Sequence, residues 1–323
     1  MTRPGTILKV GVVGVGHLGR HHARLYAGMA GVQLVGVHDL EKARTQAVAA
    51  QTGSRPFSRL EDLAREVDAV SVAVPTVAHV QVAEAFLDHG IACLVEKPLA
   101  PDLPSGRNLV SRAQESGTLL MVGQTERFNP AMVAARRQVK HPGFIEAQRL
   151  GSFSSRSLDV DVVLDLMIHD IDAILDLVGE RPIAVDAVGV AALTDKIDLA
   201  NARLRFPSGC AANLTASRMS LGQVRKIRIF QPDAYITVDC SSREVLKYSL
   251  VKGEGPRPEI RGESVAVSQG EPLALELGEF VAAVKEKRPP RCAGEEGLAA
   301  LEIALQIRAQ MSRVQAKSAA GEA

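Results

Sequence analysis

The first 124 residues alternate between two hydrophobic patterns. Near-continuous apolar runs, typical of fully buried strands, are separated by segments with apolar residues at helical spacing. The apolar runs occupy residues 7–16, 32–39, 69–75, 91–98 and 119–124. The helical segments occupy residues 17–29, 40–53, 58–67, 78–90 and 105–117. Buried strands that alternate with helices predict a parallel sheet covered on both faces, so we expect residues 1–124 to form a doubly wound Rossmann domain.

The pattern changes after residue 124. Shorter segments with alternating apolar and polar residues predict strands at 183–192, 199–209, 210–218, 224–232, 234–240 and 244–251. Helical spacing is found at 129–140, 161–178, 273–287 and 295–314. We therefore expect residues 125–323 to form a second domain of α+β type. It would have an open-faced, mainly antiparallel sheet with helices on one face, and its last helix could pack back on the first domain.

Composition excludes several classes of protein. The chain has 323 residues and a formal net charge of +1, so its charge gives no reason to expect binding to nucleic acid or to an anionic membrane. No apolar run approaches the ~18 residues of a membrane span. The N-terminal residues lack a signal-peptide pattern, and the four cysteines are too far apart in sequence for a metal motif. We expect a cytoplasmic protein with buried free thiols and no metal.

A glycine motif closes the first predicted strand and opens the first helix. Gly14, Gly16 and Gly19 would allow a tight turn and a close approach of the backbone to a pyrophosphate at the helix N-terminus. Asp39 ends the second strand about 20 residues later, where a carboxylate accepts hydrogen bonds from ribose hydroxyls. Because Asp39 would repel a 2′-phosphate, we expect NAD rather than NADP, although Lys42 and Arg44 lie nearby.

A second chemical signal lies at the end of the strand predicted at 91–98. There Glu96 and Lys97 precede Pro98, which favours an extended conformation for Lys97. Ligands of open parallel sheets bind beyond the carboxyl ends of the strands. Lys97 could therefore stabilise a developing alkoxide during hydride transfer, or it could form a surface ion pair.

The segment from Asp161 to Leu175 carries two stripes at helical spacing. One stripe is apolar, and the other contains Asp165, His169, Asp172 and Asp176. Residues four apart are neighbours on a helix, so Asp165 can orient His169, whose side chain titrates near neutrality. The polar stripe could be a solvated face, a metal site or a proton-transfer site.

Three motifs together resemble those of the glucose–fructose oxidoreductase, inositol dehydrogenase and rhizopine-catabolism (Gfo/Idh/MocA) family. They are the Gly14–Gly19 motif, the Glu96–Pro98 tripeptide and the segment 165–172. The resemblance extends over essentially the whole chain. It implies a Rossmann domain followed by an open-faced sheet domain, and an NAD(P)-dependent dehydrogenase acting on a secondary hydroxyl of a sugar or cyclic polyol.

The resemblance also implies roles for individual residues. Lys97 matches the catalytic lysine of the family, and Asp165 and His169 match its D-x-x-x-H pair, in which histidine is the general base. The expected substrate contacts are Lys97, Arg127, Arg156, Asp165 and His169. The expected cofactor contacts are Gly14, Gly16, His17, Leu18, Gly19, Asp39, Pro75, Thr76, His79, Glu96, Lys97 and Gln124. We interpret His21 and His22 as structural or exposed, and the roles of Asp170 and Asp172 stay open.

Within the family, the chain is similar to members that oxidise the 3-hydroxyl of a UDP-N-acetylhexosamine, such as UDP-N-acetylglucosamine, to a keto sugar. Arg156, Arg218, Arg225 and Lys226 could then form a diphosphate clamp, or they could be solvated charges at the sheet. The alternatives are an inositol or free-sugar dehydrogenase, an NADPH-dependent reductase of the same fold and a non-enzymatic dinucleotide sensor. An exposed sheet face commonly pairs with another subunit, so we expect a homodimer or homotetramer.

Overall fold

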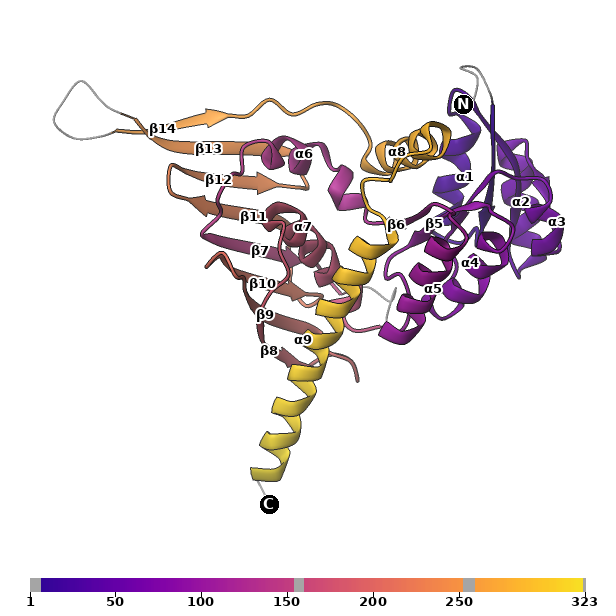
Figure 1. The fold of residues 1–323 in the computed structure, drawn as a ribbon. Coiled ribbons are helices and arrows are strands. Elements are labelled where there is room, and N and C mark those ends of the chain that lie inside the picture. The colour runs from indigo at the N-terminus through magenta and orange to yellow at the C-terminus, as the bar shows by residue number, and fades with distance from the viewer. Residues whose placement is uncertain (1–6, 154–159, 252–258, 322–323) are drawn as a thin grey trace. The chain divides into compact units, whose positions relative to one another are not determined.

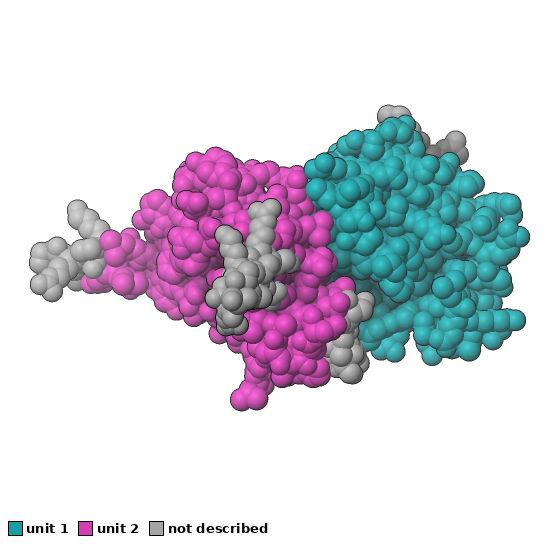
Figure 2. Space-filling view, turned by 90° about the horizontal axis from the view of Figure 1, so that it is seen from below, with its two compact units in different colours: residues 1–125, 271–301 teal, residues 126–270, 302–323 magenta. Residues whose placement is uncertain are grey.

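The computed structural model describes residues 7–153, 160–251 and 259–321, and the side chains of these residues up to Met311. Contacts within the chain divide it into two units (Figure 2). Unit 1 comprises residues 1–125 and 271–301, and unit 2 comprises residues 126–270 and 302–323. Within the described residues, no helix combines the length and apolarity that a membrane crossing requires.

Unit 1 is built on a parallel sheet with the strand order β3-β2-β1-β4-β5-β6 (Figure 1). The strands are β1 (Leu8–Val13), β2 (Val32–His38), β3 (Arg55–Pro56), β4 (Ala69–Val72), β5 (Ala92–Glu96) and β6 (Leu120–Gly123). Helices α1 (Gly19–Ala27), α2 (Lys42–Thr52), α3 (Leu60–Ala64), α4 (His79–Leu87) and α5 (Leu103–Glu115) connect them. Every residue of β4, β5 and β6 is buried, as the apolar runs predicted. The strand order confirms the Rossmann fold.

Residues 271–301 complete unit 1, so the boundary differs from the predicted division at residue 124, while the start of the last helix packs back on the first domain as the sequence suggested. They contain helix α8 (Pro272–Glu286) and the first turns of helix α9 (Gly294–Gly321). The backbone N–H of Val122 donates to the carbonyl of Cys292 (2.9 Å), and Cys292 is buried in the core of the unit. A Cβ on Gly297 would lie 2.3 Å from the Val122 side chain, so the start of α9 packs directly on β6. Residues 271–301 therefore cover β6, the last strand of the parallel sheet.

Unit 2 contains one sheet with the strand order β14-β13-β12-β11-β7-β10-β9-β8 (Figure 1). The strands are β7 (Phe144–Leu150), β8 (Ala184–Val190), β9 (Leu199–Arg205), β10 (Ala211–Ser217), β11 (Val224–Gln231), β12 (Ala234–Asp239), β13 (Glu244–Val251) and β14 (Glu259–Ser264). Neighbouring strands are antiparallel except β7 and β10, which pair in parallel. Alternate residues are buried in the central strands β7 and β10, and α6 (Pro130–Arg136) and α7 (Ile168–Val178) contact the sheet. The prediction of a mainly antiparallel, open-faced sheet is confirmed.

The segment with two stripes is not one regular helix. Residues Val163–Met167 form a π-helical turn, and α7 begins only at Ile168. Asp161 starts the segment, because its Oδ1 accepts hydrogen bonds from the backbone N–H groups of Val163 and Leu164 (3.0 and 3.1 Å). A π-helical turn bonds i to i+5, so it changes the angular register between the residues before and after it. Asp165 lies in this turn and His169 lies in α7.

Candidate active site

The glycine loop of unit 1 leaves an open space beside its middle glycine. Gly14 has a φ of +80°, and a Cβ there would lie 2.6 Å from the carbonyl oxygen of Ala73. A Cβ on Gly19 would lie 1.8 Å from the carbonyl oxygen of Gly14, whereas a Cβ on Gly16 would meet nothing within 4 Å. Gly14 and Gly19 are therefore required by the fold itself. Gly16 instead leaves room for a pyrophosphate to approach the backbone, as a dinucleotide site needs.

Asp39 follows β2 in a fixed orientation. Its Oδ2 accepts a hydrogen bond from the backbone N–H of Val15 (2.9 Å), and its Oδ1 accepts one from that of Glu41 (2.9 Å). The guanidinium of Arg44 lies 3.2 Å from Oδ1. The carboxylate is thus tied to Val15, the residue next to Gly14, beside the loop where the sequence predicts a ribose contact. Arg44 partly offsets its negative charge, as the sequence analysis anticipated.

The other expected contacts in the first helical turn are exposed. His17 and Leu18 are both on the surface, and Nδ1 of His17 lies 3.3 Å from Nη2 of Arg20. Leu18 is the residue that precedes α1 and makes no side-chain cap. Both side chains are therefore accessible beside the glycine loop, where the cofactor contacts are expected.

Lys97 follows β5 at the same edge of the sheet. Its side chain is half-buried, and its backbone N–H donates to Oε2 of Glu96 (3.3 Å). The carboxylate of Glu96 is buried and lies 3.0 Å from Nε2 of His22, which is fully buried in α1. His22 is therefore structural, as expected. Glu96, predicted as a cofactor contact, has its carboxylate buried against His22.

The loop after β4 contains the next group of expected contacts. Pro75 is exposed and Thr76 is half-buried at the start of a short 3₁₀ turn, Thr76–Ala78. His79 is 1% exposed, and its two ring nitrogens lie 2.9 Å from the carbonyl oxygens of Pro98 and Val74. Pro75 and Thr76 are accessible to a cofactor. His79 has no accessible polar atom, so its geometry differs from the expected cofactor contact.

Gln124 follows β6 and is 1% exposed. Neither its Oε1 nor its Nε2 has a hydrogen-bond partner among the residues that the structure describes. Buried amide groups are nearly always hydrogen-bonded to protein, water or ligand. This amide therefore fits a role in holding a bound molecule at the carboxyl edge of the sheet.

The candidate catalytic pair of unit 2 lies at the junction of the π-helical turn and α7. Asp165 and His169 are both half-buried. Their neighbours along the segment are fully engaged in the core: Asp170 accepts from Nη2 of Arg149 (2.8 Å), and Arg149 also donates to Glu126 (2.9 Å). Arg149 could not be predicted from the sequence, because a single arginine in a strand has no distinctive pattern.

Arg127 and Asp172 form a buried ion pair. Nε of Arg127 lies 2.6 Å from Oδ2 of Asp172, and Nη2 lies 2.9 Å from Oδ1. The side chains are only 5% and 1% exposed. The sequence predicts that Arg127 contacts the substrate, and in the structure its guanidinium faces Asp172. Its guanidinium instead anchors α7 by a bidentate bond, and Asp172 has the same structural role.

The basic residues of the suggested diphosphate clamp do not form one cluster. Arg156 lies outside the described residues. Arg218 is buried, and its Nη2 donates to the carbonyl of Val160 (2.7 Å). Arg225 and Lys226 are consecutive in β11, and consecutive residues of a strand point to opposite faces. Lys226 pairs with Asp239 (3.4 Å). The described members therefore support the alternative of separate structural and surface charges.

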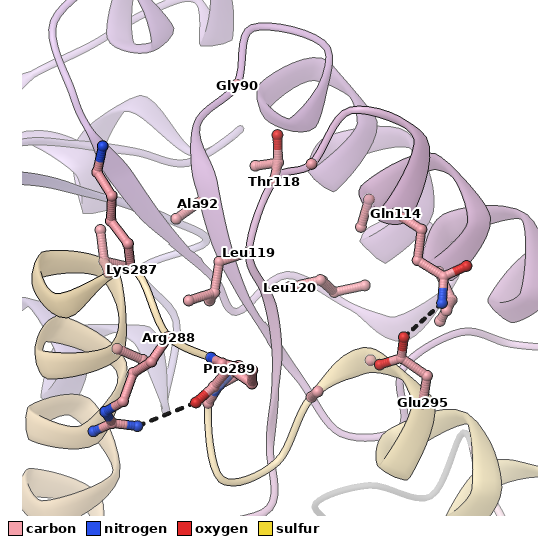
Figure 3. Close-up of a pocket in the computed structure, with 18 of the residues that line it drawn as sticks. Gly90, Ala92, Gln114, Thr118, Leu119, Leu120, Lys287, Arg288, Pro289 and Glu295 are labelled. Atoms are coloured by element: carbon pink, nitrogen blue, oxygen red, sulfur yellow. Dashed lines mark hydrogen bonds between the residues drawn. The ribbon is translucent and has the colours of Figure 1, made fainter.

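A cavity of about 590 Å³ lies within unit 1 (Figure 3). Its lining includes the first residues of β5 and β6, Ala92 and Leu120, together with Lys287 and Arg288. Gly14 and Lys97, in contrast, follow the last residues of their strands. In parallel strands the two ends lie at opposite edges of the sheet, so this cavity is not the dinucleotide site. In the described residues, no group of three or more His, Cys, Asp or Glu side chains could hold a metal ion.

The doubly wound sheet, the glycine loop and the oriented Asp39 define unit 1 as a dinucleotide-binding domain of an oxidoreductase. The comparison with known families agrees. Residues 8–124 match the model of the oxidoreductase family with an NAD-binding Rossmann fold, and residues 130–240 match the GFO/IDH/MocA C-terminal domain. The chain belongs to the Gfo/Idh/MocA family of oxidoreductases, its cofactor is NAD, and the predicted family is confirmed.

Two relatives extend over nearly the whole chain. A UDP-N-acetylglucosamine 3-dehydrogenase of Acidithiobacillus ferrooxidans is 42% identical over 93% of this chain and 96% of its own. The solved structure of the A. ferrooxidans enzyme has a TM-score of 0.89, covering 94% of this chain and 97% of that one. An inositol 2-dehydrogenase of Rhizobium meliloti is 28% identical over 92% of this chain and 94% of its own.

The glycine loop generates a prediction that separates packing from ligand binding. Gly19→Ala should lower the free energy of unfolding by about 3 kcal/mol or more, because its Cβ would overlap the carbonyl of Gly14. Gly16→Ala should leave the melting temperature unchanged and weaken NAD binding by ~10-fold or more, because its Cβ would enter the open space. Thermal unfolding and titration calorimetry with NAD measure the two effects.

The control for this experiment is Gly222→Ala, because Gly222 in unit 2 also has no atom within 4 Å of a built Cβ. It should change neither property. Unaltered NAD affinity in Gly16→Ala would contradict the assignment of the open space to the cofactor.

The buried ion pair generates a second prediction. Asp172→Ala should lower the free energy of unfolding by about 3 kcal/mol, because it removes the bidentate partner of the buried Arg127 guanidinium and leaves the longer contact to Asp176 (3.6 Å). The double variant Arg127→Met/Asp172→Leu should recover most of this loss, and urea denaturation measures both. If Arg127→Met instead lowers substrate affinity with no change in stability, Arg127 is a ligand contact after all.

Proposed function

We propose that this protein oxidises the 3-hydroxyl of UDP-N-acetylglucosamine to a keto group, with NAD as the hydride acceptor. The observation that carries the dehydrogenase assignment is the position of Lys97 directly after β5, at the sheet edge that also holds the glycine loop and Asp39. The substrate is suggested by the A. ferrooxidans enzyme, which is similar over nearly its whole length. The R. meliloti relative makes a cyclic polyol the second candidate substrate.

The proposed mechanism gives one step to each polar side chain. The Lys97 ammonium donates a hydrogen bond to the reacting oxygen and stabilises the charge that develops as the hydride leaves. His169 accepts the hydroxyl proton, and Asp165 holds the ring of His169 in the required orientation. Bound NAD supplies the hydride acceptor. Gly16 and Asp39 would hold its pyrophosphate and adenosine ribose, and Gln124 would contact it beyond β6.

The direct test is a substrate panel with NAD. Absorbance at 340 nm should increase with UDP-N-acetylglucosamine, and the product should be the 3-keto sugar by mass spectrometry and NMR. Turnover of myo-inositol or of free glucose, with none of the nucleotide sugar, would overturn the proposed substrate while retaining the dehydrogenase class. NAD binding without turnover of any substrate would instead favour a dinucleotide sensor.

The proposed proton acceptor generates a third prediction. His169→Ala should lower kcat by ~10²–10⁴ while leaving the Kd for NAD nearly unchanged, because general-base catalysis contributes a factor of this size. Initial rates at 340 nm and NAD titration measure the two quantities. His141→Ala is the control, since His141 is an exposed histidine of the same unit. An unchanged kcat in His169→Ala would remove this residue from the mechanism.

The exposed face of the unit 2 sheet supports a homo-oligomer. The strand registers align Phe144, Phe230, Tyr235 and Tyr248 in one row across β7, β11, β12 and β13. Adjacent ring centroids in this aromatic row lie 4.7–5.7 Å apart. Leu250 and Ile260 are 66% and 75% exposed beside it. Such an apolar face favours contact with a second copy of the chain, in the dimer or tetramer we propose.

The aromatic row generates a fourth prediction. Tyr235→Glu should shift the mass measured by light scattering toward the monomer, because it places a charge in the middle of the row. Glu61→Lys, on the exposed part of α3 in unit 1, should leave the mass unchanged. A wild-type protein that is monomeric at micromolar concentration would refute the assignment.

We also propose a cytoplasmic location, because all four cysteines are buried free thiols.

A further inference from the structure

His79 connects two loops at the carboxyl edge of the unit 1 sheet. It is the first residue of α4 and is 1% exposed. Its Nδ1 lies 2.9 Å from the carbonyl oxygen of Pro98, and its Nε2 lies 2.9 Å from the carbonyl oxygen of Val74. Both ring nitrogens contact main-chain carbonyl oxygens, so His79 constrains the backbone of these two loops.

Each of the two carbonyls belongs to a functional loop. Val74 follows β4, and its backbone N lies 2.7 Å from where a Cβ of Gly14 would be, so this loop packs against the glycine loop. Pro98 follows Lys97, the residue that we propose contacts the reacting oxygen. The imidazole of His79 thus links the backbone beside Gly14 to the backbone beside Lys97.

The chemistry of the ring makes the two bonds unequal. A neutral imidazole has one N–H and can donate to only one carbonyl, whereas the imidazolium donates to both. Burial lowers the pKa of His79, although the two carbonyls and the charge of Glu96 oppose this shift. A substitution that keeps a donor on one side only therefore tests each bond separately.

We propose that His79 is a positioning residue that fixes the Lys97 backbone through the carbonyl of Pro98. The inference rests on the proposed role of Lys97 in the dehydrogenase reaction. His79 does not contact the substrate or the cofactor. It holds the loop after β5 against the loop after β4, and this contact keeps the backbone of Lys97 in a fixed position.

Two amide variants separate the bond to Pro98 from the bond to Val74. His79→Asn places an amide N–H near the position of Nδ1 and can still donate to Pro98. His79→Gln places its amide near the position of Nε2, toward Val74. We expect kcat to fall ~10- to 100-fold in His79→Gln and His79→Ala, because a displacement of about 1 Å costs a factor of this size. His79→Asn should retain kcat within about threefold, and KM for NAD should change little in all three.

A labelling experiment tests the same point without any substrate. Trace acetylation with acetic anhydride, followed by peptide mass spectrometry, gives the reactivity of Lys97 relative to that of the exposed Lys42. This ratio should change at least ~3-fold in His79→Ala and His79→Gln and stay at the wild-type value in His79→Asn, because only the last keeps the Pro98 bond. This measurement remains informative if the proposed substrate is wrong.

His89→Ala is the matched control, because His89 lies just after the same helix and is exposed. It should change neither the rate nor the labelling ratio. A labelling ratio that is unchanged in every His79 variant would overturn the proposal. So would loss of kcat in His79→Asn equal to that in His79→Gln, or loss of kcat in parallel with the melting temperature, because each would indicate a purely structural histidine.

Discussion

The close approach of Gly14 to the Ala73–Val74 peptide is the contact on which the loops at the carboxyl edge of the unit 1 sheet depend. It brings the end of β1 to within van der Waals distance of the end of β4, with no side chain between them. The backbone can then turn into α1, and Asp39 can bond to the N–H of Val15. His79 continues the same chain of contacts from Val74 to Pro98. Three loop ends are therefore held together by the close packing at Gly14 and by the side chains of Asp39 and His79.

The sequence was sufficient to predict the Rossmann sheet of residues 1–124, because its signals are local. Each buried strand is a continuous apolar run, and Gly14 and Gly19 occur where a Cβ would overlap the backbone. The parallel pair of β7 and β10 could not be predicted in this way, because the sequence of a strand does not indicate which distant strand it pairs with. The π-helical turn was also missed. It arises from a different hydrogen-bond register, while the apolar spacing around Asp165 still indicates a helix.

Charged residues were the least predictable part of the candidate site. Arg127 and Asp172 have the residue types of a substrate contact, but they are buried against each other 45 positions apart in sequence. A one-dimensional pattern cannot distinguish an arginine that faces a ligand from one that faces an acid of the same chain. Lys97 was easier to interpret, because its place after a parallel strand determines the edge of the sheet at which it lies.

The return of residues 271–301 to unit 1 has a consequence for how the protein is made. The backbone N–H of Val122 in β6 donates its hydrogen bond to the carbonyl of Cys292, and the start of α9 packs on the same strand. During synthesis the Rossmann sheet emerges first, yet the surface over β6 stays uncovered until almost the entire chain has left the ribosome. A fragment that ends at residue 125 would expose that apolar surface permanently. The first unit is therefore complete only in the nearly finished chain.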